Sequence, residues 1–123
     1  MNDRRPTLRV VPRPSDINHV GNIFGGWVLS QMDIAGGIVA AKRANGPVAT
    51  VAIEAMTFIA PILINDIVSV YAEVAAVGRT SIKIRIEVTA TRGQDMNEIR
   101  VTEGLFTFVA IDKQHRPRPV DPL

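Results

Sequence analysis

The sequence has no cysteine and only two histidines, and these shortages exclude several kinds of chemistry. Without cysteine there is no disulfide and no thiolate metal site. His19 and His115 lie in predicted loops, and no motif for nucleophilic catalysis surrounds either of them. We therefore expect neither a catalytic triad nor a metal site, and any catalytic group must come from another residue type.

Aromatic residues are also scarce, at 5% of the chain. Basic residues and stacking rings do not alternate anywhere, so the sequence does not favour nucleic-acid binding. The net charge is only +2. Segments 1–14 and 113–123 nevertheless hold seven of the 14 basic residues. We interpret the ends, about 1–6 and 113–123, as basic tails, and the proline-rich segment 116–122 as extended.

Long hydrophobic runs are absent except for Ile23–Ala41, in which only Ser30, Gln31 and Asp33 are polar. Its length would cross a membrane, but an aspartate near the centre costs about 3 kcal/mol, and four glycines weaken the span further. We expect no membrane span. The polar N-terminus lacks the apolar segment of a secretion signal, so the expected location is cytoplasmic.

In a small domain, such an apolar run predicts a mostly buried helix. A buried carboxylate costs several kcal/mol unless it is paired, hydrogen-bonded or protonated, and proteins keep one mainly where it is used. Asp33 is therefore the first candidate for a catalytic group.

The rest of the chain has β-strand patterns. Ser81–Thr91 alternates apolar and polar residues, which indicates a strand with one buried face. Ile67–Val77 precedes it, and Gly78 supplies a hairpin turn between the two. Three further strands are predicted at Val48–Ala60, Ile99–Ile111 and, as a short edge strand, Thr7–Val11. The predicted fold is a single α+β domain, in which an antiparallel sheet in meander order curls around one long helix.

A helical projection places small residues on the same stripe as Asp33: Gly26, Ser30, Gly37, Ala40 and Ala44. A bulkier stripe, with Val28, Met32, Ala35 and Val39, suits the sheet. The small stripe suits close approach by a second subunit, a ligand channel or a neighbouring backbone. A purely structural alternative is that Gly36 and Gly37 allow tight helix packing, with Asp33 hydrogen-bonded to backbone.

Gly25 and Gly26 occupy the predicted first helical turn, where N–H groups lack intrahelical partners and the helix dipole is positive. Such groups bind anions or a developing oxyanion. Asp33 lies about 12 Å further along the helix, too far to share one carbonyl with Gly25. Two antiparallel helices related by a twofold axis would bring the glycines of one to the aspartate of the other. We therefore predict a dimer with composite sites.

Several segments together resemble the hotdog-fold acyl-CoA thioesterases, closest to the YciA-like subfamily. The resemblance is carried by Pro14–Asn18, Gly21–Asp33, Thr50–Ile59, Val77–Ile84 and Phe106–Ala110. It implies a curved sheet around a central helix, a homodimer at minimum and possibly a trimer of dimers. It also implies hydrolysis of acyl-CoA without a cofactor, since CoA is part of the substrate.

The resemblance also implies roles for individual residues. Asp33 would be the catalytic carboxylate, the Gly25 and Gly26 turn would polarise the thioester carbonyl, and Asn18 would orient the carbonyl or the water. The residues implied in substrate binding are Asn22, Arg79, Thr80, Ser81 and Lys83, with the two cations available to CoA phosphates.

The sequence departs from the subfamily at two places. It has Asn18-His19-Val20-Gly21-Asn22 where close relatives tend to have Asn-x-Asn-Gly-Asp, and Ala60 where a lysine is expected. These departures bear on acyl-chain preference and rate. Two alternatives remain: a hotdog enoyl-CoA hydratase or dehydratase, suggested by the segment 16–19, and a non-catalytic acyl-CoA-binding protein.

Overall fold

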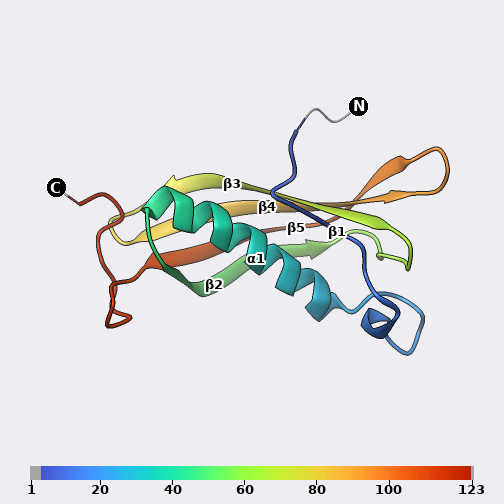
Figure 1. Ribbon diagram of the computed structural model, residues 1–123, viewed down its shortest axis with the longest axis horizontal. Helices are drawn as coiled ribbons and strands as arrows, with labels where there is room; N and C mark the ends of the chain where they lie inside the picture. The colour runs from blue at the N-terminus through green and yellow to red at the C-terminus, as the bar shows by residue number, and fades with distance from the viewer. Residues whose placement is uncertain (1–3, 123) are drawn as a thin grey trace.

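The computed structural model describes residues 4–122 and contains one long helix packed on one face of a five-stranded antiparallel sheet (Figure 1). This confirms the predicted α+β class. The strands are β1 (Leu8–Val10), β2 (Val48–Phe58), β3 (Ile67–Val77), β4 (Ser81–Arg92) and β5 (Asn97–Ala110), and the helices are η1 (Pro14–Asp16) and α1 (Gly25–Ala44).

The strand order, β1-β3-β4-β5-β2, differs from the predicted meander at β2. Strands β3, β4 and β5 are neighbours joined by short turns, as predicted, but β2 pairs with β5 instead of β3. The meander prediction was wrong there because periodicity reports the faces of a strand and not its neighbours. The connection 59–66 carries the chain from one edge of the sheet towards the other, which leaves β2 as an edge strand.

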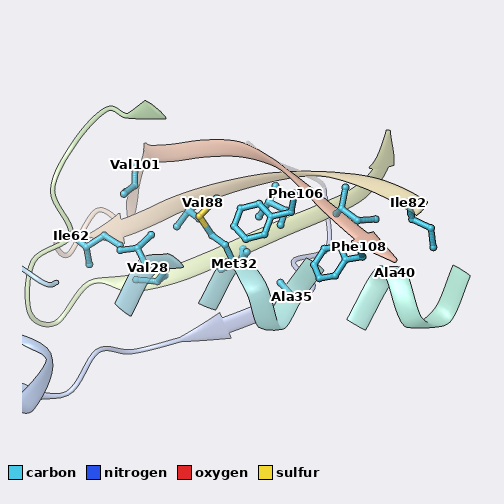
Figure 2. Packing of buried hydrophobic residues seen from close by; sticks show 14 of the residues in the cluster. Val28, Met32, Ala35, Ala40, Ile62, Ile82, Val88, Val101, Phe106 and Phe108 are labelled. Atoms are coloured by element: carbon cyan, nitrogen blue, oxygen red, sulfur yellow. The ribbon is translucent and has the colours of Figure 1, made fainter. Parts of the chain in front are cut away.

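The core lies between α1 and the inner face of the sheet (Figure 2). Alternate residues of β4, including Ile82, Ile84 and Ile86, are fully buried. Phe106 and Phe108 of β5 stack at 6.4 Å between ring centroids, and Met32 of α1 packs against this layer. Burial of each such side chain contributes about 1.5–3 kcal/mol to folding.

Helix α1 is buried on one side only, which corrects the prediction of a mostly buried helix. Its buried residues are Val28, Met32, Ala35, Gly36, Ala40 and Ala44. On the opposite side Asp33 is exposed, and Ile34 and Ile38 are about half exposed. A single sheet covers only one face of a helix, and nothing else in residues 4–122 covers the other. No helix in this part of the chain is long and apolar enough to span a membrane.

The glycine pair in the middle of α1 has two different surroundings. A Cβ atom at Gly36 would lie 2.8 Å from Ile86 Cδ1 and 2.9 Å from Phe108 Cε1, so only glycine allows this close approach. At Gly37 the nearest atom would be Phe108 Cε2, at an ordinary 3.9 Å. The explanation that glycine allows the helix to pack tightly therefore holds for Gly36.

The C-terminal segment packs against the domain, which corrects its interpretation as an extended tail. Val120 is 3% exposed, and its N–H donates to Arg79 O at 2.8 Å. Arg118 donates from Nη2 to Ala44 O at 2.9 Å, at the C-terminal end of α1. The segment lies beside that end of the helix in Figure 1. Sequence composition reports that the segment is basic and rich in proline, but not that a neighbouring surface accepts it.

The N-terminal basic segment is described only from Arg4 onward, so part of the predicted tail lies outside the described residues. Arg4 stacks over the ring of Tyr71, 4.0 Å from its centroid, and also forms an ion pair with Glu87. These contacts hold the segment on the sheet face that turns away from α1.

Candidate active site

Asp33 lies on the exposed side of α1, next to the edge strand β2. Thr50 Oγ1 donates a hydrogen bond to Asp33 Oδ1 at 2.5 Å. In the described part of the chain the second carboxylate oxygen has no hydrogen-bond partner, so it is open to a ligand. The carboxylate is therefore oriented by a neighbour and accessible, rather than buried as predicted.

Sequence reasoning missed Thr50 as a site residue. Thr50 is exposed and pairs with Phe108 in the sheet register, which turns its side chain towards α1. A register shift between Thr50 and Ala52 follows immediately. Only the pairing of β2 with β5 identifies Thr50 as a site residue, and local periodicity carries no information on strand pairing.

The N-terminus of α1 presents free donors. Phe24 is the N-cap residue and makes no side-chain capping bond, while the N–H groups of Trp27 and Val28 both bond to Phe24 O. The N–H groups of Gly25 and Gly26 have no partner among residues 4–122. Both glycines are exposed, and a ligand can approach them closely because neither carries a side chain. Two open N–H groups at the positive end of a 20-residue helix suit an anion or a developing oxyanion.

Asn18 shapes the loop that leads into this helix. Its Oδ1 accepts hydrogen bonds from the N–H groups of Val20 and Asn22, each at 3.0 Å, and its own N–H donates to Asn22 O at 2.6 Å. The side-chain oxygen of Asn18, Oδ1, is thus already occupied by hydrogen bonds within the loop. Only the Nδ2 group remains to orient a substrate carbonyl or a water, and the Asn22 side chain lies in the same half-buried loop.

The structure separates the other predicted substrate-binding residues. Arg79 lies at the exposed β3–β4 turn and lines a cleft of about 500 Å³ with Gly78, Pro119, Asp121 and Pro122. Thr80 and Ser81 are half-buried at the same turn.

Lys83 lies on the sheet face away from α1. It pairs there with Glu54 Oε1 at 3.2 Å. One chain therefore unites Asp33 with Thr50, and Gly25 with Gly26, but does not bring Lys83 to either group.

An exposed apolar surface adjoins Asp33. On α1, Ile34 and Ile38 are 49% and 50% exposed, and on the edge strand β2, Val51 and Ile53 are 57% and 44% exposed. We name these four residues the α1–β2 patch. Exposed apolar side chains beside an unpaired strand edge are typical of a protein interface.

Known proteins resemble this chain in sequence and fold. The model of the thioesterase superfamily matches residues 20–96, more than half of the chain. The acyl-CoA thioester hydrolase YciA of Escherichia coli K12 is 44% identical over 117 residues, covering 90% of this chain and 86% of YciA.

Solved structures agree with these matches. The hexameric thioesterase y2039 from Yersinia pestis superposes with a TM-score of 0.92 at 40% identity, covering 100% of both chains. Cj0915 of Campylobacter jejuni, a hexameric hotdog-fold thioesterase, has a TM-score of 0.91 at 40% identity and covers 98% of this chain and 93% of its own. The chain therefore belongs to the thioesterase superfamily, within its hotdog-fold acyl-CoA thioesterases of the YciA-like subfamily.

Proposed function

We propose that this protein hydrolyses acyl-CoA thioesters to free CoA and a carboxylic acid, with Asp33 and the N-terminus of a partner's α1 as the two halves of the site. The observation that carries the proposal is an accessible carboxylate, oriented by Thr50, on a helix whose Gly25 and Gly26 N–H groups are open. The relatives named above are described as hydrolases or thioesterases of this kind, which supports the substrate class.

A second copy of the chain supplies the missing half. Gly25 and Asp33 are about 12 Å apart along one helix, so one carbonyl cannot contact both. The α1–β2 patch flanks Asp33 and gives a partner an apolar surface to bury. We propose a homodimer with antiparallel α1 helices, and a trimer of dimers because the Yersinia and Campylobacter relatives are hexameric.

In the proposed reaction, Asp33 accepts a proton from a water molecule that attacks the thioester carbonyl carbon. The partner's Gly25 and Gly26 N–H groups stabilise the negative charge that develops on the carbonyl oxygen. The C–S bond then breaks, and the CoA sulfur leaves as a thiolate that takes up the proton held by Asp33. Direct attack by Asp33, which forms an anhydride that water hydrolyses, is an alternative with the same products.

The nucleotide of CoA is expected near the β3–β4 turn. The Arg79 side chain has no hydrogen-bond or ion-pair partner among residues 4–122 and can meet phosphates there, with Thr80 and Ser81 as hydroxyl donors. Lys83 would have to leave Glu54 to contribute, and Asn22 would contact substrate from the helix-entry loop. The proposed reaction uses no cofactor, and the cytoplasmic location stays a prediction.

The direct test replaces Asp33 by asparagine, which still accepts the hydrogen bond from Thr50 but cannot take a proton. We expect thiol release from acyl-CoA to fall about 10³-fold with the oligomer intact. Glu73→Gln removes an exposed carboxylate from the far face of the sheet and is the matched control. A fully active Asp33→Asn enzyme would refute the assignment. An enoyl-CoA hydration assay run beside it tests the hydratase alternative.

Mixed oligomers test the composite site. We expect Asp33→Asn chains mixed with Gly25→Pro chains to regain activity, because one of the two sites in a mixed dimer combines an intact aspartate with an intact helix N-terminus. If mixing restores nothing, each site belongs to one chain.

A further inference from the structure

An ion pair between a partly exposed arginine and a buried aspartate lies where β4 ends. Asp66 is 2% exposed and receives two hydrogen bonds from Arg92, from Nε to Oδ1 at 2.8 Å and from Nη2 to Oδ2 at 2.6 Å. Burial acts most strongly on the pKa of Asp66 and raises it. The hydrogen bonds from Arg92 and Leu63 N–H, with the Arg92 charge, outweigh burial and hold the pKa below its usual value. The pair is therefore ionised at neutral pH.

The pair secures the connection between β2 and β3. Arg92 Nη2 also donates to Pro61 O at 3.2 Å, and Leu63 N–H donates to Asp66 Oδ2 at 2.8 Å. Asp66 N–H donates back to Leu63 O at 3.1 Å. Two backbone groups of the segment 61–66, Pro61 O and Leu63 N–H, are thus tied to one guanidinium and one carboxylate, and a backbone hydrogen bond closes the turn between Leu63 and Asp66.

This connection in turn holds the entry to α1. Ile62, between the tied residues, is 2% exposed and packs beside Val28 of the first helical turns (Figure 2). Its carbonyl oxygen accepts a hydrogen bond from Ile23 N–H at 3.1 Å. Ile23 immediately precedes the N-cap Phe24, whose own N–H donates to Asp16 O at 3.0 Å. Ile62 therefore restrains both the backbone and the buried side of the helix start.

We propose that Arg92 and Asp66 are positioning residues for catalysis, which aim the Gly25 and Gly26 N–H groups through the Ile62 carbonyl. The inference rests on the proposed function of those N–H groups. It gives a role to a bidentate pair whose carboxylate is buried just before β3. Oxyanion donors act only when they already point at the developing charge, and a displacement of about 1 Å costs up to 100-fold in rate.

The expected signature is a loss of turnover without a matching loss of binding. Arg92→Gln removes the charge and the bidentate contact, and we expect kcat to fall about tenfold while KM for acyl-CoA changes little. Arg92→Lys keeps the charge and one contact, and we expect it to recover part of that loss. If Arg92→Gln prevents folding, Arg92→Lys and Asp66→Asn provide milder tests of the same split.

The other end of α1 offers a matched control. Arg43 also binds an aspartate bidentately, with Nη1 and Nη2 at 2.7 and 2.9 Å from the two oxygens of Asp121. Arg43→Gln and Arg43→Lys repeat the same chemical changes away from the helix N-terminus, and we expect kcat to stay near wild type. Equal kcat losses in the two series, or a change confined to KM, would overturn the proposal.

A double-mutant cycle separates positioning from general destabilisation. In a Gly25→Pro background the Gly25 donor is already absent and only the Gly26 N–H is left to be displaced, so adding Arg92→Gln should lower kcat less than it does in the wild type. Fully independent effects would argue against the proposal. Activity in Asp33→Asn would reject the proposed function itself, whereas a dead Asp33→Asn beside an unaffected Arg92→Gln would reject only the positioning role.

Discussion

The two ends of helix α1 differ in how the rest of the described chain satisfies their backbone hydrogen-bonding groups. At the C-terminal end, Asn45 adopts a left-handed conformation with φ of 55°, and Gly46 N–H bonds to Ala41 O at 3.1 Å. Arg118 then donates to Ala44 O. At the N-terminal end no side chain caps the helix, and the first two N–H groups are left open among the described residues. The chain completes one end with its own groups, and at the other it leaves two N–H groups open among the described residues, where we propose that a ligand binds.

The charges near α1 follow the same division. Lys42 and Arg43 lie in the last turn, where they favour the negative end of the helix dipole, and the first turn has no acidic residue. A ligand anion at the first turn therefore meets no competing carboxylate there. The comparison is the basis for proposing the site at the helix end where, among the described residues, the fold leaves N–H groups without a hydrogen-bond partner.

Among changes along α1 that leave Asp33 intact, the largest effect should come from removing a donor at the open N-terminal end. Proline is well tolerated at the first helical position, Phe24 before it has φ of −55° and ψ of 137°, which suits a residue preceding proline, and proline has no N–H. We expect Gly25→Pro to lower kcat about 100-fold while circular dichroism stays unchanged.

The control is Gly25→Ala, which keeps the N–H and places a Cβ 3.8 Å from Phe58 Cζ, an ordinary contact. It should keep most of the activity. If Gly25→Pro and Gly25→Ala lower kcat equally, glycine is needed at this position for the room it leaves and not for its N–H group.

Between the two ends of α1, we expect alanine substitutions at Gly36 and Gly37 to affect stability differently. Gly36→Ala would force a Cβ to within 3 Å of Ile86 and Phe108, and should lower the free energy of unfolding by about 1–3 kcal/mol. Gly37→Ala meets only an ordinary contact and gains helix propensity, so it should be neutral or stabilising by up to about 1 kcal/mol. Denaturant unfolding measures both. A destabilising Gly37→Ala would indicate that another chain approaches at that position.

Removing the hydrogen bonds at the C-terminal end of α1 should lower stability and leave catalysis unchanged. Arg118→Met removes hydrogen bonds to Ala44 O and Ile111 O, and we expect a loss of about 1–3 kcal/mol with kcat near wild type. Arg116→Met removes the same charge from an exposed position in the same segment and should change little. Equal stability of the two variants would contradict the role of Arg118 at the helix end.

The smallest effect concerns the exposed pair at the closed end. The hydrogen bond from Arg43 holds the pKa of Asp121 below its usual value. The stabilisation is therefore present above the unfolded pKa of about 4 and is lost as the pH falls through the folded value. We expect Asp121→Asn to lower the thermal midpoint slightly at pH 7, and the difference from wild type to shrink as the pH falls below about 4. High salt should also shrink it, because both groups are exposed to solvent.

Much of the fold follows from local patterns in the sequence. The predicted range Ile67–Val77 coincides with β3, and the alternating run from Ser81 matches β4 to within one residue. The glycines predicted at the helix start are Gly25 and Gly26 of its first turn. Turn glycines, alternation and helical stripes depend on interactions within a few residues, so a single sequence contains them.

Local sequence patterns do not contain the contacts between segments that are distant in the chain. The pairing of β2 with β5, and with it the hydrogen bond from Thr50 to Asp33, depends on which strands meet after the chain crosses the domain. The exposure of Asp33 depends on which side of α1 the sheet covers, and the packing of Val120 depends on a surface formed by other segments.

The sequence by itself determined that a helix with two glycines at its start and a carboxylate eight residues later packs on an antiparallel sheet, because helical and strand periodicities are local. Only the tertiary structure decided that Thr50 orients the carboxylate and that Arg92 and Asp66 tie down the connection beside the helix entry. These contacts join segments far apart in the chain, and their geometry exists only once the core has brought those segments together.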